Sequence, residues 1–198
     1  MKKMTYLLLA VLLTGLVSSC KKGEDDPFLS LRSRKARVAG EWTVSAATIK
    51  EVETDDLSSV NRTMTFNGSL ISTVTTTTIN GSTTSQTETT AFTQKYTFEK
   101  DGTYTRTDTY EDGVYTTKGT WSFVGKSKEN ELKNKEAILL TETSYTADGE
   151  TGNYTGFDGT ILVIQQLKNK EMIFTTAFSS TDADESQSSE SSFTLTQN

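Results

Sequence analysis

The amino-acid sequence predicts an all-β protein, an antiparallel up-and-down meander of about eight or nine strands closed into a barrel. From Gly40 onward, apolar and polar residues alternate with a period close to two, and turn residues recur about every ten residues. Apolar residues make up only 33% of the chain, and Thr and Ser replace them rather than charge. Thr is β-branched and favours strands. A meander of this size avoids exposed edges by closing on itself. A β-sandwich is the alternative, with residues 125–136 or 146–158 as its crossover.

The predicted strands are connected by recognisable turns. Asp-Gly pairs at 101–102 and 112–113 supply the positive φ angles that tight hairpins need. The polar segment 80–85 is expected to join two long Thr-rich strands, and residues 125–136 and 180–192 are expected to be mobile loops. In chain order, the predicted strands are 42–52, 62–79, 87–98, 103–110, 114–124, 137–145, 159–167, 171–179 and 191–196.

Residues 1–19 have the parts of a bacterial lipoprotein signal peptide. Lys2 and Lys3 give a positive start, and residues 6–17 form an apolar stretch shorter than the roughly 20 residues of a spanning helix. The sequence Val17-Ser18-Ser19-Cys20 resembles the lipobox, which leaves a lipid-modified Cys as the new N-terminus. Cys20 is the only cysteine. We therefore expect cleavage after residue 19 and anchoring to a membrane through acyl chains on Cys20.

Residues 20–37 are expected to form a flexible tether with a short helical turn at 28–38, followed by one barrel domain at 38–198. The acidic run Glu24-Asp25-Asp26 resembles the export signal of Bacteroidetes-type lipoproteins. That resemblance implies lipid anchoring in the cell outer membrane and exposure at the cell surface. A simple solvated spacer is the alternative.

Composition narrows the classes of function. A formal charge of −6 and a pI near 4.8 argue against nucleic acid as a partner. The chain has no His, which excludes Ser-His and Cys-His nucleophiles and His metal sites. The acidic loop at 148–153 lacks the spacing of a calcium-binding loop, and no pair of carboxylates stands out as a catalytic dyad. We expect no enzyme activity, no metal and no cofactor.

The strand at 103–110 carries the candidate ligand-binding residues. Tyr104, Arg106, Asp108 and Tyr110 alternate onto one face, and threonines occupy the other. If the tyrosine face points inward, it gives the barrel an aromatic pocket with a buried Arg106–Asp108 pair, which suits a small ligand. If it points outward, the pair is worth about 0–1 kcal/mol. An inward Arg106 needs Asp108, a tyrosine hydroxyl or an anionic ligand head group as counter-charge.

Two tryptophan motifs resemble those of a known family. Gly40-Glu41-Trp42, after a helical turn, resembles the motif that opens the first strand of lipocalins. The segment Gly119-Thr120-Trp121-Ser122-Phe123 is similar to lipocalin-like domains of Bacteroidetes lipoproteins. The resemblance implies an eight-stranded calycin barrel that holds a small molecule, with Trp42 closing one end and Gly40, Trp42 and Trp121 in structural roles. Lipocalins pack an Arg of the last strand across this Trp. Residues 193–196 offer none, which leaves Arg62 or Arg106 for that place, or no cation there at all.

The sequence thus favours a monomeric, lipid-anchored envelope protein whose barrel binds a small hydrophobic or amphipathic ligand. The alternative is a surface interaction module with a filled barrel and no ligand. In that case Thr-rich outer strands would contact a glycan or a partner lipoprotein.

Overall fold

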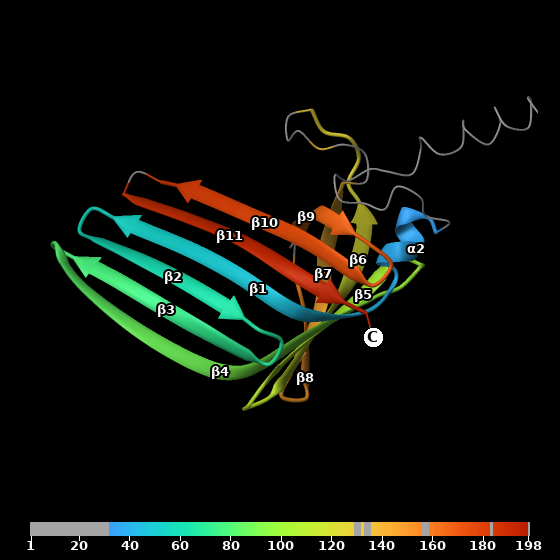
Figure 1. Ribbon diagram of the computed structural model, residues 1–198, viewed down its shortest axis with the longest axis horizontal. Helices are drawn as coiled ribbons and strands as arrows, with labels where there is room; N and C mark the ends of the chain where they lie inside the picture. The colour runs from blue at the N-terminus through green and yellow to red at the C-terminus, as the bar shows by residue number, and fades with distance from the viewer. Residues whose placement is uncertain (1–31, 129–131, 133–135, 156–158, 183, 198) are drawn as a thin grey trace, which may run out of the picture.

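The computed structural model describes residues 32–128, 132, 136–155, 159–182 and 184–197. The signal peptide, Cys20 and the acidic run 24–26 lie outside these residues, so the expectations about them stay predictions. The described chain forms one short helix and eleven strands (Figure 1). No helix within these ranges is long and apolar enough to cross a membrane.

The elements follow one another with short connections. Helix α2 (Arg34–Val38) begins at the cap Ser33, whose side chain accepts a hydrogen bond from the backbone of Ala36. The strands are β1 (Gly40–Asp55), β2 (Ser58–Phe66), β3 (Leu70–Ile79), β4 (Ser82–Phe98), β5 (Thr103–Tyr110), β6 (Val114–Phe123), β7 (Ala137–Ala147), β8 (Glu150–Asn153), β9 (Gly159–Leu167), β10 (Glu171–Thr181) and β11 (Glu185–Thr196).

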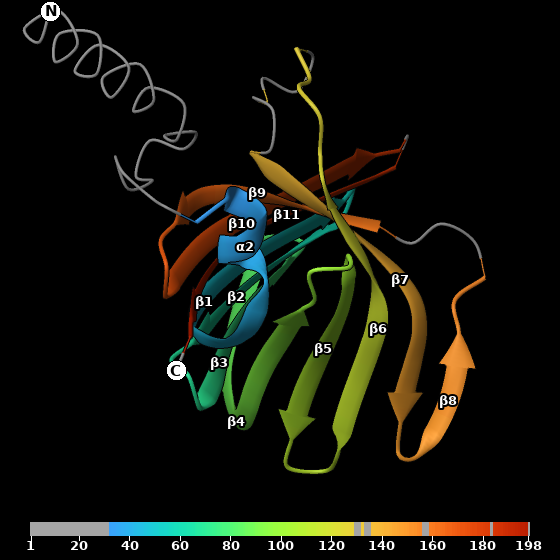
Figure 2. The same cartoon turned by 90° about the vertical axis from the view of Figure 1, so that its right-hand side faces the viewer.

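The strands close into an antiparallel barrel. Each strand from β1 to β6 pairs with the next, β6 pairs with β7, β7 with β9, and β9, β10 and β11 lead back to β1. Figure 2 shows β4, β5, β6, β7 and β8 side by side along one wall. The predicted barrel is therefore confirmed in place of the sandwich. The ring has ten strands, with β8 as an extra strand beside β7, where eight or nine were expected.

The extra strands come from a hairpin inserted between β1 and β4. At its start, β1 pairs directly with the end of β4, from Gly40 opposite Phe98 to Thr43 opposite Lys95. Further along, β1 and β4 separate, and β2 and β3 fill the space between them. The single strand predicted at 62–79 is wrong, because Asn67 turns the chain. Its side-chain oxygen accepts hydrogen bonds from the backbone of Ser69 and Leu70, and Gly68 has a φ of 96°.

Three other predicted loops also contain strand residues, for a related reason. Asn80 and Gly81, with φ angles of 48° and 81°, make a two-residue hairpin, so β4 begins at Ser82 instead of residue 87. Residues 180–192, expected as a mobile loop, contain the paired outer ends of β10 and β11. β8 lies within the expected loop 146–158. These segments form strands because their backbones pair with neighbouring strands. Their sequences lack the apolar alternation from which strands were predicted.

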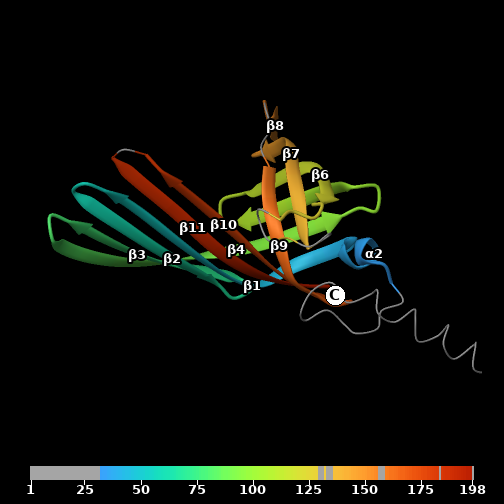
Figure 3. The same cartoon turned by 90° about the horizontal axis from the view of Figure 1, so that it is seen from above.

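Six strands of the ring extend away from the α2 end as one extended sheet (Figures 1 and 3). We define the extended sheet as residues 48–55, 82–90, 175–181 and 185–192 together with β2 and β3. Cross-strand pairing is continuous over it from β10 to β4. Side chains on both faces reach solvent: Thr48, Lys50 and Val52 on one face of β1 are exposed, and Ile49 and Glu51 on the other are only half-buried.

The hydrophobic core fills the barrel at the end where α2 lies (Figure 1). Each large side chain buried there contributes roughly 1.5–3 kcal/mol. The ring of Phe98 packs against Tyr96, Tyr104 and Trp121, with centroids 5.7, 6.2 and 5.7 Å apart. The largest fully buried side chains are Trp42, Phe98, Phe174, Ile138, Leu167, Met172, Leu195, Val38 and Val44. The interior at this end is packed with side chains rather than hollow.

Candidate functional site

The predicted ligand-binding residues all lie on the face of β5 that points into the barrel. Tyr104 is 2% exposed and belongs to the core. Arg106 and Asp108 come next along the strand and are partly buried, and Tyr110 reaches the rim. The site thus runs from the core outward along one strand. It ends at the Glu111–Gly113 turn. This turn lies at the end of β5 that is farther from α2.

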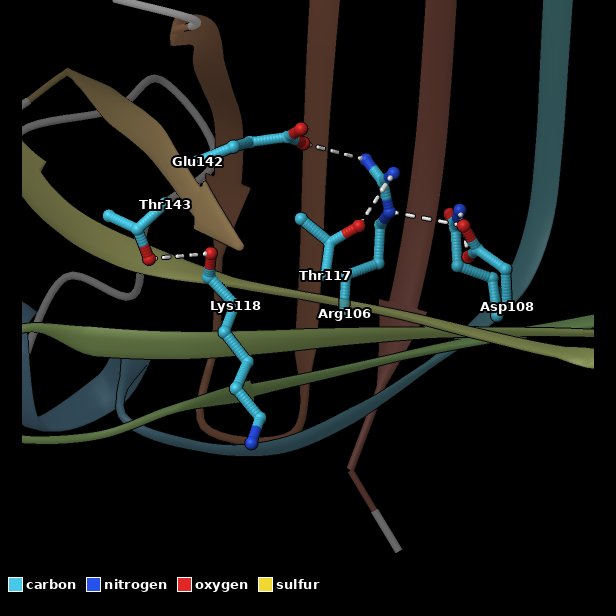
Figure 4. Close-up of polar contacts among 7 residues, drawn as sticks. Arg106, Asp108, Thr117, Lys118, Glu142 and Thr143 are labelled. Carbon is cyan, nitrogen blue, oxygen red and sulfur yellow. Dashed lines mark hydrogen bonds and ion pairs between the residues drawn. The ribbon is translucent and has the colours of Figure 1, made fainter. Parts of the chain in front are cut away.

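Arg106 forms a charged cluster with two carboxylates (Figure 4). Its Nε lies 3.1 Å from Asp108 Oδ2, and its Nη1 lies 3.3 Å from Glu142 Oε1. Its Nη2 donates to the hydroxyl of Thr117 at 3.3 Å. The side chains of Arg106, Asp108 and Glu142 are 29%, 13% and 12% exposed. Figure 4 shows Lys118 pointing away from this cluster, on the other side of the sheet.

Neighbouring polar groups hold the cluster in place. Gln94 on β4 lies opposite Asp108 and donates from Nε2 to its Oδ1 at 2.8 Å. Burial of the guanidinium opposes its charge, but Tyr96, Asp108 and Glu142 outweigh that effect and raise the pKa of Arg106. Arg106 therefore stays charged and paired.

Burial also perturbs the phenols around the cluster. It raises the pKa of Tyr96 to about 12. Burial and the charge of Glu142 raise the pKa of Tyr104 still more, and the Tyr104 hydroxyl has no hydrogen-bond partner within the described residues. Burial together with Glu142 also raises the pKa of Tyr154. All three phenols therefore remain neutral at physiological pH.

Gly119 on β6 makes room for the ring of Tyr104. It pairs with Tyr104 on one side and with Glu142 on the other, at a β-bulge next to Lys118. A Cβ placed on Gly119 would lie 2.1 Å from the carbonyl oxygen of Thr141 and 2.7 Å from Cε1 of Tyr104. The strand can follow this path only with a glycine, which leaves space over the sheet for the Tyr104 ring.

Beyond the cluster, the barrel opens into a cup of about 440 Å³, within the usual size range of small-molecule sites. The rings of Tyr110 and Tyr115 meet edge to face, with centroids 5.6 Å apart, and those of Tyr145 and Tyr154 lie 5.4 Å apart. The cup is lined by Arg106, Asp108, Tyr110, Asp112, Tyr115, Thr116, Thr117, Tyr145, Thr146 and Tyr154. It offers aromatic faces, carboxylates and hydroxyls to a ligand.

Glu142 is the main residue that sequence reasoning missed. Its signal was present, because Ile138, Leu140 and Glu142 alternate on one face of the predicted strand at 137–145, and the first two are buried. Tyr145 and Tyr154 were missed for different reasons. A bulge at Thr143 shifts the side-chain alternation before Tyr145, and Tyr154 follows β8, which was not predicted.

The two tryptophans occupy structural positions. Trp42 is 1% exposed and donates from its indole to the carbonyl of Val38 at 2.7 Å, which joins α2 to β1. Trp121 donates to the carbonyl of Glu99 at 2.9 Å, and Lys35 of α2 lies over its ring. Gly40 has a φ of 141°, and a Cβ there would lie 2.6 Å from Gln197 Nε2.

The two arginines considered for the Trp42 position are engaged elsewhere. Arg62 lies on the extended sheet with Glu51 and Glu53, at 3.8 and 3.5 Å, and Arg106 lies in the cluster. Arg37 of α2 is buried at the α2 end of the barrel and donates to the carbonyl of Leu167.

Comparisons with protein-family models, curated proteins and solved structures find no match to this chain. Within the described ranges, no group of three or more carboxylates is placed to hold a metal ion.

Proposed function

We propose that this protein is a lipid-anchored protein of the cell envelope whose barrel binds a small amphipathic molecule in the cup. The observation that supports this proposal is a partly buried charged cluster at the floor of an open, tyrosine-lined hollow. A barrel whose only task was stability would gain by filling this space with apolar side chains, since a buried ion pair costs desolvation energy.

The cup suits one end of a molecule rather than the whole of it. The core beneath it is closed by Tyr96, Tyr104 and Phe98, so a ligand cannot pass deep into the barrel. The half-exposed rings of Tyr110 and Tyr145 provide apolar contact, and the carboxylates and hydroxyls provide polar contact. We infer a ligand with a polar head group and a compact apolar body.

Native mass spectrometry of the protein after mild extraction from its own cells tests this function. We expect a co-purified small molecule, and we expect Tyr110→Ala to lose it because Tyr110 forms part of the wall of the cup. Thr107→Ala is the matched control, since Thr107 lies on the opposite face of the same strand. An empty wild-type protein, or equal retention by both variants, would contradict the proposal.

Anchoring through Cys20 is the second part of the proposal and is supported by the lipobox-like sequence alone. Cys20→Ser should release the protein from the membrane fraction. Continued sedimentation with membranes in high salt would show another anchor. The chain enters the barrel at the α2 end, and the cup lies at the other end of β5.

Surface exposure is proposed from the acidic run 24–26 and needs its own test. Replacing Glu24, Asp25 and Asp26 with Ala should reduce protease accessibility on intact cells. Replacing Lys21 and Lys22 with Ala in the same tether is the control. Equal accessibility of both variants would show that the acidic run is only a spacer.

A second candidate function, glycan binding, is favoured by the outer face of the extended sheet. Two complete cross-strand rows on this face consist of hydroxyl side chains. One row is Thr175, Ser192, Thr48, Thr65, Ser72 and Thr89. The other is Thr181, Ser186, Thr54, Ser59, Thr78 and Thr83. Neighbouring strands lie about 4.8 Å apart, so these rows present regularly spaced hydroxyls and methyls.

Glycan binding can be tested without disturbing the cup. Thr65→Lys places a long charged side chain within the first hydroxyl row and should abolish co-sedimentation with an insoluble neutral polysaccharide from the envelope. Thr73→Lys is the control, because Thr73 lies on the neighbouring strand and points to the other face. Unchanged co-sedimentation of the Thr65 variant would exclude this face as the binding surface.

A further inference from the structure

The charge of the cup limits the kind of head group that it can take, and this inference rests on the proposed function. Arg106 is already paired with Asp108 and Glu142. Of the three counter-charges considered for Arg106, Asp108 is the one present, together with Glu142, so Arg106 needs no anionic ligand head group. Asp112 also lines the cup. Among the described residues that line the cup, Asp108 and Asp112 are acidic and Arg106 is basic, and Glu142 pairs with Arg106 from outside this lining, so negative charge is in excess.

The aromatic lining also favours a positively charged ligand. The faces of tyrosine rings carry negative electrostatic potential and attract cations within about 6 Å of the ring centroid. Two tyrosine pairs line the cup, Tyr110 with Tyr115 and Tyr145 with Tyr154, and each pair is tilted so that ring faces and edges point in different directions. An ammonium group with apolar substituents matches both the carboxylates and these rings.

We propose that the cup selects a small organic cation, an ammonium or amidinium group attached to a compact apolar body. Asp112 and the outer oxygens of the cluster attract the charge, and the tyrosine rings contact the apolar body. Arg106 then has a positioning role, since it fixes both carboxylates and keeps two negative charges close together at the floor of the cup.

Three probes with the same benzyl body test the sign of the preferred charge: benzyltrimethylammonium, phenylacetate and benzyl alcohol. The purified lipidated protein in neutral detergent is titrated calorimetrically, with empty micelles as the blank. We expect benzyltrimethylammonium to bind tightest and phenylacetate weakest. Phenylacetate binding as tightly as the cation would overturn the inference but leave the proposed function standing. Absence of binding by all three would overturn both.

A variant that removes one negative charge from the cup tests whether the preference for a cation arises there. Asp112→Asn should weaken benzyltrimethylammonium about three- to fivefold, the size expected for one carboxylate a few ångströms away in a watery site, and leave benzyl alcohol unchanged. Asp56→Asn is the control, because it removes the same charge from the turn between β1 and β2, at the far end of the extended sheet. Equal weakening by both variants would mean that net charge alone acts, and it would overturn the cup as the cation site.

Discussion

Replacing Arg106 with Leu tests how the cluster contributes to the barrel. The change removes the guanidinium but leaves Asp108 and Glu142, whose side chains are only 13% and 12% exposed. Removing one partner of a buried ion pair usually costs 3–5 kcal/mol, because the remaining charge has lost its counter-charge. Arg106 itself is 29% exposed, which lessens the loss. We expect Arg106→Leu to lower the free energy of unfolding by about 2–4 kcal/mol at pH 7.

Arg62→Leu is the matched control for this variant. Arg62 also lies beside two carboxylates, Glu51 and Glu53, but its side chain is 41% exposed and theirs are 38% exposed. Exposed pairs contribute about 0–1 kcal/mol, so this variant should be almost as stable as the wild type. Urea unfolding followed by tryptophan fluorescence compares the two variants directly.

The pH dependence of the free energy of unfolding tests the role of Arg106 more sharply. In Arg106→Leu, the two carboxylates repel each other in a partly buried site, so their pKa values rise above the unfolded values of about 4. Acids with raised folded pKa values stabilise the fold when protonated, and that stability is lost as the pH rises through the folded pKa. The deficit of this variant should therefore shrink as the pH falls from 7 towards 4. A deficit that is independent of pH, or equal to that of Arg62→Leu, would refute the reasoning.

Three further predictions concern the core. Trp42→Ala should cost about 3–5 kcal/mol in urea unfolding, the usual loss for a large buried aromatic; an unchanged midpoint would mean that Trp42 is dispensable. Gly119→Ala should cost about 2–3 kcal/mol or prevent folding, because its Cβ would overlap the Thr141 carbonyl; wild-type stability would disprove the close approach. In a spectrophotometric titration, Tyr96 and Tyr104 should ionise well above pH 10, with stability falling from pH 10 towards 12 because their folded pKa values are raised; ionisation of all tyrosines near pH 10 would contradict their burial.

The parts of the fold that depend on local chemistry could be predicted from the sequence. The turn at 112–113 joins β5 to β6 as expected, although neither Asp112 nor Gly113 has the positive φ angle predicted there, and β9 has the predicted bounds 159–167. The face shared by Tyr104 and Arg106 follows from the two-residue period of a strand. The choice between an inward and an outward face could not be made from that strand alone, because it depends on which neighbouring strands cover each side.

Contacts and strands that depend on pairing between distant segments could not be predicted from turn residues or from the two-residue period. The partner Glu142 lies 36 residues from Arg106 in the chain, and only the closure between β6 and β7 brings them together. The outer end of β11 has no apolar residues, so its composition indicated a loop. Its backbone is nevertheless satisfied by pairing with β1 and β10 on either side.

The low apolar content of the chain is compatible with a closed barrel because the α2 end of the barrel and the extended sheet need different kinds of side chain. Apolar side chains gather at the α2 end of the barrel, where Trp42, Phe98 and Phe174 are buried. Away from Phe66, which belongs to the core, side chains on both faces of the extended sheet reach solvent. Apolar side chains there would have little to pack against, whereas Thr keeps the β-branched geometry that favours strands and presents a hydroxyl to solvent. Hydroxyl pairs such as Thr78 with Thr83, 3.0 Å apart, join neighbouring strands on its outer face. A Thr-rich sequence is thus what a sheet one layer thick requires, and the overall hydrophobicity of the chain underestimates how well the barrel end is packed.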